Sequence, residues 1–151
     1  MNKVIGLDLG TTTLGIAYSD VLGFVHGIET FRFDKNQYIV ARKHVHEVVA
    51  KYGIKEIAIG LPLHLSGEMS EMANNVMRFI EDLKVEDPTL DIHTVDERLS
   101  SVSANNTISA LGMNHNQRKQ SVDRIAACVI LDTYIRIKLS GNMSSTKNSK
   151  N

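Results

Sequence analysis

The spacing of apolar residues constrains the fold of this chain more than any other feature. Short apolar segments predict strands, whereas apolar residues that recur every three or four positions predict helices. The strands are expected at residues 3–9, 14–18, 24–33, 54–61 and 91–95. The helices are expected at about 41–52, 69–83, 100–111 and 117–139. The order is therefore three strands, then two helix–strand units, then two helices.

This order predicts a mixed sheet. The first three strands follow one another closely, so they should form an antiparallel meander. Each of the last two strands follows a helix, and such crossovers join parallel strands. We therefore expect an α/β protein in which a five-stranded sheet carries helices on both faces. That is the arrangement of the ribonuclease-H-like fold, although other α+β folds begin with similar elements.

The chain length of 151 residues fits one domain. We expect residues 1–139 to form it, and residues 140–151, rich in Ser and Asn, to be a disordered polar tail. No apolar stretch is long enough to cross a membrane, and Asp8 interrupts any export signal. The single cysteine, Cys128, excludes an internal disulfide and fits a reducing compartment. We therefore expect a cytoplasmic protein.

The net charge of the chain does not indicate a nucleic-acid partner. Lys plus Arg and Asp plus Glu both number 17, so the formal net charge is zero. A dedicated nucleic-acid binder usually carries an excess of basic residues. Any nucleic acid must therefore be held by a local basic patch or through metal ions.

Asp8 stands out because it lies inside an apolar strand. A buried carboxylate is costly unless it is paired or binds a metal ion. Two interpretations stay open. Asp8 either accepts hydrogen bonds from the turn at residues 10–13, or points into a cleft as a metal ligand.

Three further carboxylates lie near the ends of predicted elements. Asp96 and Glu97 follow the last strand. Because neighbouring side chains on a strand point to opposite faces, only one of them can join Asp8 directly. Asp96 could instead cap the next helix, and Glu97 could be solvated. Asp123 lies near the start of the long helix, where the helix dipole alone favours a negative charge.

Asp8, Glu97 and Asp123 can converge at one end of the sheet. Clustered carboxylates repel one another unless a cation neutralises them, and oxygen ligands suit Mg²⁺ or Mn²⁺. Two such ions can activate a water and stabilise the leaving oxygen in phosphodiester hydrolysis. The placement of these residues therefore favours a nuclease that uses two divalent ions.

Four stretches of the chain, in the same order, resemble the YqgF/RuvX family. They are residues 5–10 with 15–17 and 19–20, residues 59–63 with 66–67, residues 96–101, and residues 122–127 with 130–131. The resemblance covers about residues 3–139. It implies a ribonuclease-H-like fold and a divalent-metal-dependent nuclease in which Asp8, Glu97 and Asp123 are the metal ligands. The family is described as Holliday-junction resolvases and as nucleases that process precursor ribosomal RNA.

The resemblance also implies residues that contact the substrate. Arg98, Ser100 and Ser101 would lie beside the nucleic-acid backbone, unless they only begin the next helix. His64, in the loop after a predicted strand, is either a proton carrier near the cleft or an ordinary loop histidine.

The chain departs from the family at one point. The family usually has a basic pair where this chain has Thr12 and Thr13. Two cations that could meet phosphates are therefore missing. Arg118, Lys119 and Arg124 could replace them, although such a run is often only a solvated helix face.

The resemblance favours a nuclease that matures the 5′ end of precursor 16S ribosomal RNA, acting on free RNA or a pre-ribosomal particle. One alternative is a resolvase of four-way DNA junctions, which needs a dimer. Another is a non-catalytic RNA- or ribosome-binding module on the same fold. The turn at residues 8–12 also resembles that of actin-like ATPases, but those proteins need a second domain. The sequence does not decide between a monomer and a homodimer.

Overall fold

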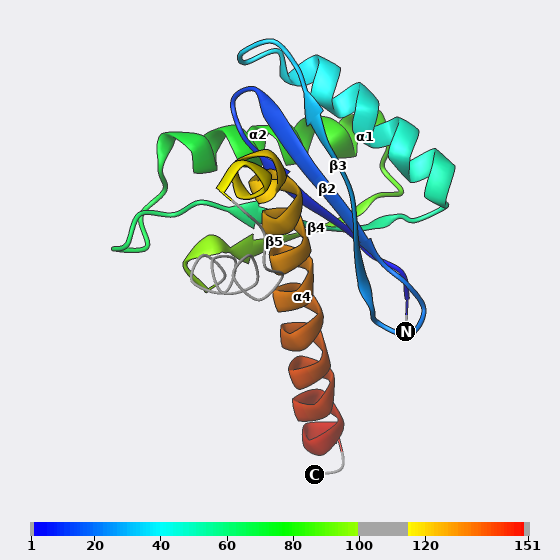
Figure 1. Cartoon of the computed structure of the whole chain (residues 1–151). Coiled ribbons are helices and arrows are strands. Elements are labelled where there is room, and N and C mark those ends of the chain that lie inside the picture. The colour runs from blue at the N-terminus through cyan, green and yellow to red at the C-terminus, as the bar shows by residue number, and fades with distance from the viewer. Residues whose placement is uncertain (1, 100–114, 150–151) are drawn as a thin grey trace.

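The fold is described by a computed structural model, which covers the backbone at residues 2–99 and 115–149 and the side chains at residues 2–99 and 124–141. The elements are β1 (Ile5–Leu9), β2 (Thr13–Ser19), β3 (Val25–Arg32), α1 (Tyr38–Tyr52), β4 (Glu56–Leu61), α2 (Glu71–Glu86), β5 (Asp91–Asp96), the short 3₁₀ helix η1 (Glu97–Leu99) and α4 (His115–Ser149) (Figure 1). The helix expected at 100–111 lies outside the described residues.

The five strands form one mixed sheet in the order β3-β2-β1-β4-β5. The pairs β1–β2 and β2–β3 are antiparallel. The pairs β1–β4 and β4–β5 are parallel, because α1 and α2 return the chain to the same edge before each new strand. The predicted meander and the two parallel additions are both confirmed.

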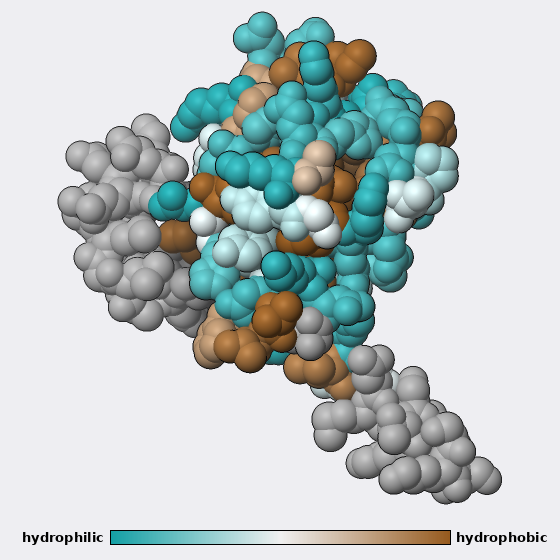
Figure 2. All heavy atoms as spheres, turned by 90° about the vertical axis from the view of Figure 1, so that its right-hand side faces the viewer, coloured by the Kyte–Doolittle hydropathy of each residue, from teal (hydrophilic) through white to brown (hydrophobic). Residues whose placement is uncertain are grey.

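Helices cover both faces of the sheet, as expected (Figure 1). One core cluster lies against α1 and α2 and includes Leu7, Val45 and Phe79. The other lies against α4 and includes Ala58 and Leu131. Because side chains alternate along a strand, a strand such as β4 contributes to both clusters, with Ile57 and Ile59 in the first and Ala58 in the second. Figure 2 shows that the surface on the α1 side is mainly hydrophilic. The buried residues of α1 are Ala41, Val45, Val48 and Val49, whereas Ile39 and Val40 in its first turn are exposed.

Capping residues set one end of α1 and one end of α2. Gly53 ends α1 in the left-handed conformation that glycine adopts readily, and its N–H donates to the carbonyl of Val49. Ser70 caps α2 by accepting a hydrogen bond from the Ala73 N–H at 2.9 Å. The backbone of α4 continues past residue 139, its predicted end, to Ser149. An apolar pattern shows where a helix packs, not where its backbone hydrogen bonding stops.

Within the described residues, no helix combines the length and the apolar character needed to cross a membrane.

Candidate active site

Asp8 lies on the face of β1 that α4 covers. A Cβ atom at Gly6, two residues earlier, would lie 2.8 Å from the carbonyl oxygen of Ala127 and 2.8 Å from the Cβ of Leu131. The α4 backbone therefore lies directly on β1 at Gly6. Side chains two residues apart share a face, so the half-buried Asp8 points to the same side, just beyond this contact.

Glu97 reaches the same face from the end of β5. A Cβ at Gly60 in β4 would lie only 2.6 Å from the Glu97 Oε1 and 2.6 Å from the Cδ1 of Ile130. The Glu97 carboxylate therefore lies on the sheet in space that only a glycine leaves open. The β1–β4 register pairs Leu7 with Ile59, and one step further places Asp8 beside Gly60.

The structure thus places two of the three expected metal ligands on the same face of the sheet, Asp8 on β1 and the Glu97 carboxylate over the neighbouring strand β4. Adjacent strands lie about 4.8 Å apart, and the Asp8 position and the Glu97 carboxylate share the α4 side of the sheet. Asp8 and Glu97 also make interactions with other parts of the chain. Of Asp96 and Glu97, Glu97 is the one whose carboxylate lies on the same face of the sheet as Asp8.

Asp123 lies on α4, and its side chain is outside the described residues. Its backbone position follows from the direction of the helix. Ile130 meets Gly60 near the end of β4, whereas the Tyr134 hydroxyl bonds Glu56 at the start of β4. The helix therefore runs antiparallel to β4, and its earlier turns, which include Asp123, lie toward the end where β1 and β4 finish.

Asp96 holds Arg98 in an ion pair. The Arg98 Nη2 lies 2.6 Å from the Asp96 Oδ2, and the Arg98 backbone N–H donates to the Asp96 Oδ1 at 3.0 Å. These guanidinium hydrogen bonds outweigh partial burial and hold the pKa of the Asp96 carboxyl below its usual value. The Arg98 Nη1 also donates to the Leu65 carbonyl at 3.3 Å. Arg98 therefore links η1 to the loop after β4.

The structure describes the side chain of only one of the other residues expected to contact substrate. The aliphatic part of Arg124 lies across β3, because a Cβ at Gly27 would lie 2.9 Å from its Cγ. Arg118 and Lys119 lie on the α4 backbone, and their side chains are outside the described residues, as are Ser100 and Ser101 entirely.

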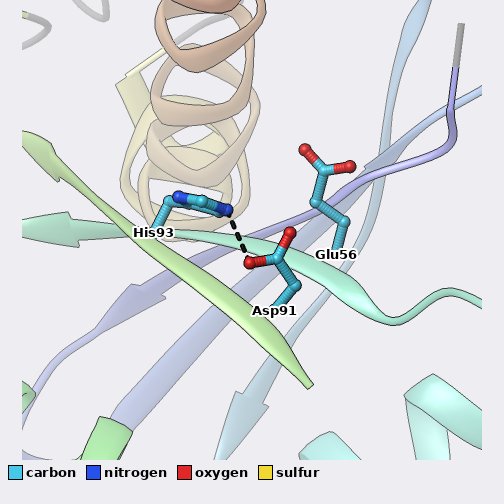
Figure 3. Close-up of side chains that lie close together, drawn as sticks. All are labelled: Glu56, Asp91 and His93. Carbon is cyan, nitrogen blue, oxygen red and sulfur yellow. Dashed lines mark ion pairs between the residues drawn. The ribbon is translucent and has the colours of Figure 1, made fainter. Parts of the chain in front are cut away.

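A second cluster, missed by the sequence analysis, lies at the opposite end of β4 and β5. Ligand atoms of Glu56, Asp91 and His93 all lie within 4.8 Å of one another (Figure 3). The register explains the cluster, since Glu56 pairs with Asp91, and His93 follows two residues later on the same face. The Asp91-x-His93 spacing at a predicted strand was the available signal, but Glu56 is too distant in sequence to associate with it.

This second cluster could hold a divalent cation, but protein groups already neutralise part of its charge. The Glu56 Oε2 accepts hydrogen bonds from the Tyr134 hydroxyl and the Lys138 ammonium, both at 2.6 Å. The His93 Nε2 lies 2.8 Å from the Asp91 Oδ1. Burial, with a further contribution from Glu56, raises the pKa of the Tyr134 hydroxyl well above its usual value. In its present contacts the cluster anchors α4 to the sheet.

Comparison with known proteins identifies the family. A family model described as "RuvX: Holliday junction resolvase" matches residues 2–137. The chain belongs to the RuvX family. Two RuvX relatives, from Geobacillus sp. (strain WCH70) and Bacillus cytotoxicus, are 36% and 34% identical to this chain over 137 residues. The match covers 90% of this chain and 99% of each relative, and both carry the name "Putative pre-16S rRNA nuclease".

Solved structures identify the fold of this RuvX chain. RuvC from T. thermophilus in complex with a Holliday junction substrate matches with a TM-score of 0.60 at 16% identity, covering 91% of this chain and 97% of RuvC. A second T. thermophilus RuvC structure matches with a TM-score of 0.59 at 14% identity, covering 90% and 96%. The predicted ribonuclease-H-like fold is confirmed. Membership of a nuclease family on this fold supports assignment to the hydrolases.

Proposed function

We propose that this chain is a divalent-metal-dependent nuclease that hydrolyses phosphodiester bonds in the maturation of the 5′ end of precursor 16S ribosomal RNA. The observation that carries the proposal is the Glu97 carboxylate lying over Gly60, beside the strand position of Asp8. Asp8 lies on β1, and the Glu97 carboxylate extends from η1 over the adjacent strand β4, so the two carboxylates could hold a cation between them. The names of the relatives favour precursor ribosomal RNA as the substrate.

The donor set fits Mg²⁺ or Mn²⁺. Asp8, Glu97 and Asp123 would supply oxygen ligands, which these hard cations prefer. When bound, two such ions would polarise the phosphodiester and lower the pKa of the attacking water. The protein holds its ligands on rigid elements: Asp8 on a central strand, and Glu97 on η1, whose geometry the Asp96–Arg98 pair maintains.

Other residues would bind the nucleic-acid backbone. We assign phosphate contacts to Arg118, Lys119 and Arg124 on α4, and keep Ser100 and Ser101 as candidates for hydroxyl contacts. Arg98 already shares its guanidinium with Asp96 and the Leu65 carbonyl. All three of its nitrogens already donate hydrogen bonds, so we assign it mainly to positioning η1 beside the substrate.

A four-way DNA junction is the second candidate substrate. The family description and the RuvC fold favour it. A resolvase must cut two symmetric strands, so it requires a homodimer, whereas processing of one RNA end is possible for a monomer. For the RNA function we place the protein in the cytoplasm, with the pre-ribosomal particle as its partner. A non-catalytic binding module would retain the fold without cleavage.

Cleavage assays separate these functions. The wild-type protein should cut a precursor 16S RNA fragment in Mn²⁺ or Mg²⁺, and EDTA or Asp8→Asn should abolish the cut. His93→Asn, at the opposite end of the sheet, should cut at the wild-type rate. The melting temperature of Asp8→Asn in EDTA should be unchanged or higher, because one of several neighbouring charges is removed.

Each contrary result has a defined meaning. Cleavage of a four-way junction but not of RNA, with a dimeric mass in solution, would favour the resolvase. Binding of RNA without cleavage would favour the non-catalytic module. Loss of metal-dependent cleavage in His93→Asn but not in Asp8→Asn would move the metal site to the Glu56 cluster.

A further inference from the structure

A groove that is lined mainly by polar and charged residues begins at the same end of the sheet as Asp8, on the side that α1 and α2 cover. Its volume is about 850 Å³. Its wall includes Thr11, which follows β1, and His64, which follows β4. Lys35, before α1, and Arg78, on α2, form other parts of the wall. The groove continues into a hollow of about 280 Å³ that also includes Arg78.

Backbone hydrogen bonds hold the groove in shape. The Asn36 N–H donates to the Thr11 carbonyl at 2.9 Å, and the Phe33 N–H donates to the Thr12 carbonyl at 2.9 Å. These bonds join the β1–β2 turn to the segment before α1. On the other side, the Ser70 hydroxyl donates to the Pro62 carbonyl and ties the loop after β4 to the start of α2. The backbone segments that frame the groove are therefore held in place by the fold.

The groove presents cations without internal partners. Lys35 and Arg78 are exposed, and within the described residues neither forms an ion pair. Nearby Arg42, by contrast, is neutralised by Asp82 at 3.5 Å and by a Glu86 oxygen at 3.1 Å. The carboxylate on the groove wall comes from Glu71. The wall therefore carries more positive than negative charge, which favours an anionic ligand.

We propose that this groove binds a single-stranded segment of the substrate next to the cleaved bond, with Lys35 and Arg78 as phosphate contacts. The proposal rests on the proposed nuclease function. A basic groove that follows a phosphate backbone is the usual feature of single-strand binding. The groove opens at the end of the sheet where β1 and β4 finish, so a strand held at the metal site on the α4 side reaches it by passing around that end. Lys35 and Arg78 then supply the cations that are absent at Thr12 and Thr13.

Neutral groups in the groove suit an unpaired strand. The Asn75 side-chain nitrogen lies 3.5 Å from the Tyr38 hydroxyl, and both residues line the groove. Amides and hydroxyls of this kind can bond base edges or sugar hydroxyls, which are accessible in single strands. Because the charged contacts are to phosphates, the affinity of the groove for a single strand should depend little on the base sequence.

The test compares two charge-matched double variants of the full chain. Lys35→Gln with Arg78→Gln removes the two groove cations. Lys43→Gln with Lys84→Gln removes two exposed cations on α1 and α2 outside the groove. Fluorescence anisotropy would measure binding of a labelled single-stranded RNA of about 12 nucleotides, within the site size of single-strand grooves. Binding is measured in EDTA, so no cleavage interferes.

The groove variant should bind roughly tenfold more weakly, and its slope of log K against log salt should fall by about 1.4, since each phosphate contact contributes about 0.7 on a single strand. The control variant should match the wild type in affinity and slope. Glu71→Gln should tighten binding of the RNA.

A comparison of RNA with DNA identifies the contacts. If the groove variant loses equal affinity for single-stranded RNA and DNA, the contacts are to phosphate alone. A larger loss for RNA would indicate additional contacts to the 2′-hydroxyl.

The proposal is overturned if the groove and control variants bind alike while both melt at the wild-type temperature. It is equally overturned if only binding of duplex is lost. Cleavage assays keep this result separate from the proposed function. If Asp8→Asn abolishes cleavage but the groove variant binds RNA like the wild type, the nuclease proposal is supported and the groove proposal is rejected. If the wild-type protein binds RNA without cleaving it and the groove variant loses that binding, the groove proposal is supported and the nuclease proposal is rejected.

Discussion

At the scale of single residues, small side chains decide where the carboxylates can lie. Because Gly60 has no side chain, the Glu97 carboxylate can lie directly on β4. Gly6 likewise leaves room for the α4 backbone on β1. Neither glycine looks special in the sequence, since both lie inside apolar strands. Their role follows from what packs on them.

Gly60→Ala tests the placement of Glu97. The new Cβ would lie 2.6 Å from the Glu97 Oε1 and 2.6 Å from the Ile130 Cδ1, so both side chains must move. We expect metal-dependent cleavage to fall at least tenfold, and the free energy of unfolding to fall by about 1–3 kcal/mol through overpacking. Gly141→Ala is the control, because a Cβ there has open space. Wild-type cleavage by Gly60→Ala would show that Glu97 is not a ligand.

At the scale of elements, α4 connects the two ends of the sheet. Its middle turns pack on β1 and β4 through Ala127 and Ile130. Further along, Tyr134 and Lys138 bond Glu56 at the start of β4. The position of the helix over the candidate metal ligands therefore depends on bonds at the opposite end.

Tyr134→Phe tests this anchor. It removes one hydrogen bond to the Glu56 carboxylate and leaves that of Lys138. We expect the free energy of unfolding, measured in urea, to fall by about 1–2 kcal/mol, because hydrogen bonds to charged groups are stronger than average. Tyr52→Phe is the matched control, since the Tyr52 hydroxyl makes no hydrogen bond within the described residues. Equal stability of the two variants would contradict an anchoring role.

At the scale of the whole molecule, the family match covers residues 2–137 and leaves the last residues outside it. We propose that residues 1–139 form the nuclease domain and that residues 140–151 are a polar tail. Lys138 is the last residue of α4 that bonds the sheet within the described side chains. The bonds that hold the helix in place therefore lie within the proposed domain.

Deletion of residues 140–151 tests this boundary. The shortened protein should melt within a few degrees of the full chain and cleave RNA at the same rate, because no described contact with the sheet is removed. Thermal unfolding and the cleavage assay would measure both. A large loss of either stability or cleavage would place the tail inside the functional unit.

The sequence by itself determined the order of elements, the mixed sheet and the candidate carboxylates. These features are encoded locally, because apolar periodicity and a carboxylate in an apolar strand are visible within a few residues. It misjudged the end of α4, since a polar composition does not stop backbone hydrogen bonding. Only the tertiary structure decided that Glu97 rests on Gly60, that Arg98 pairs with Asp96, and that Glu56 meets Asp91 and His93. Each of these depends on strand register and helix packing, which join residues that no local pattern relates.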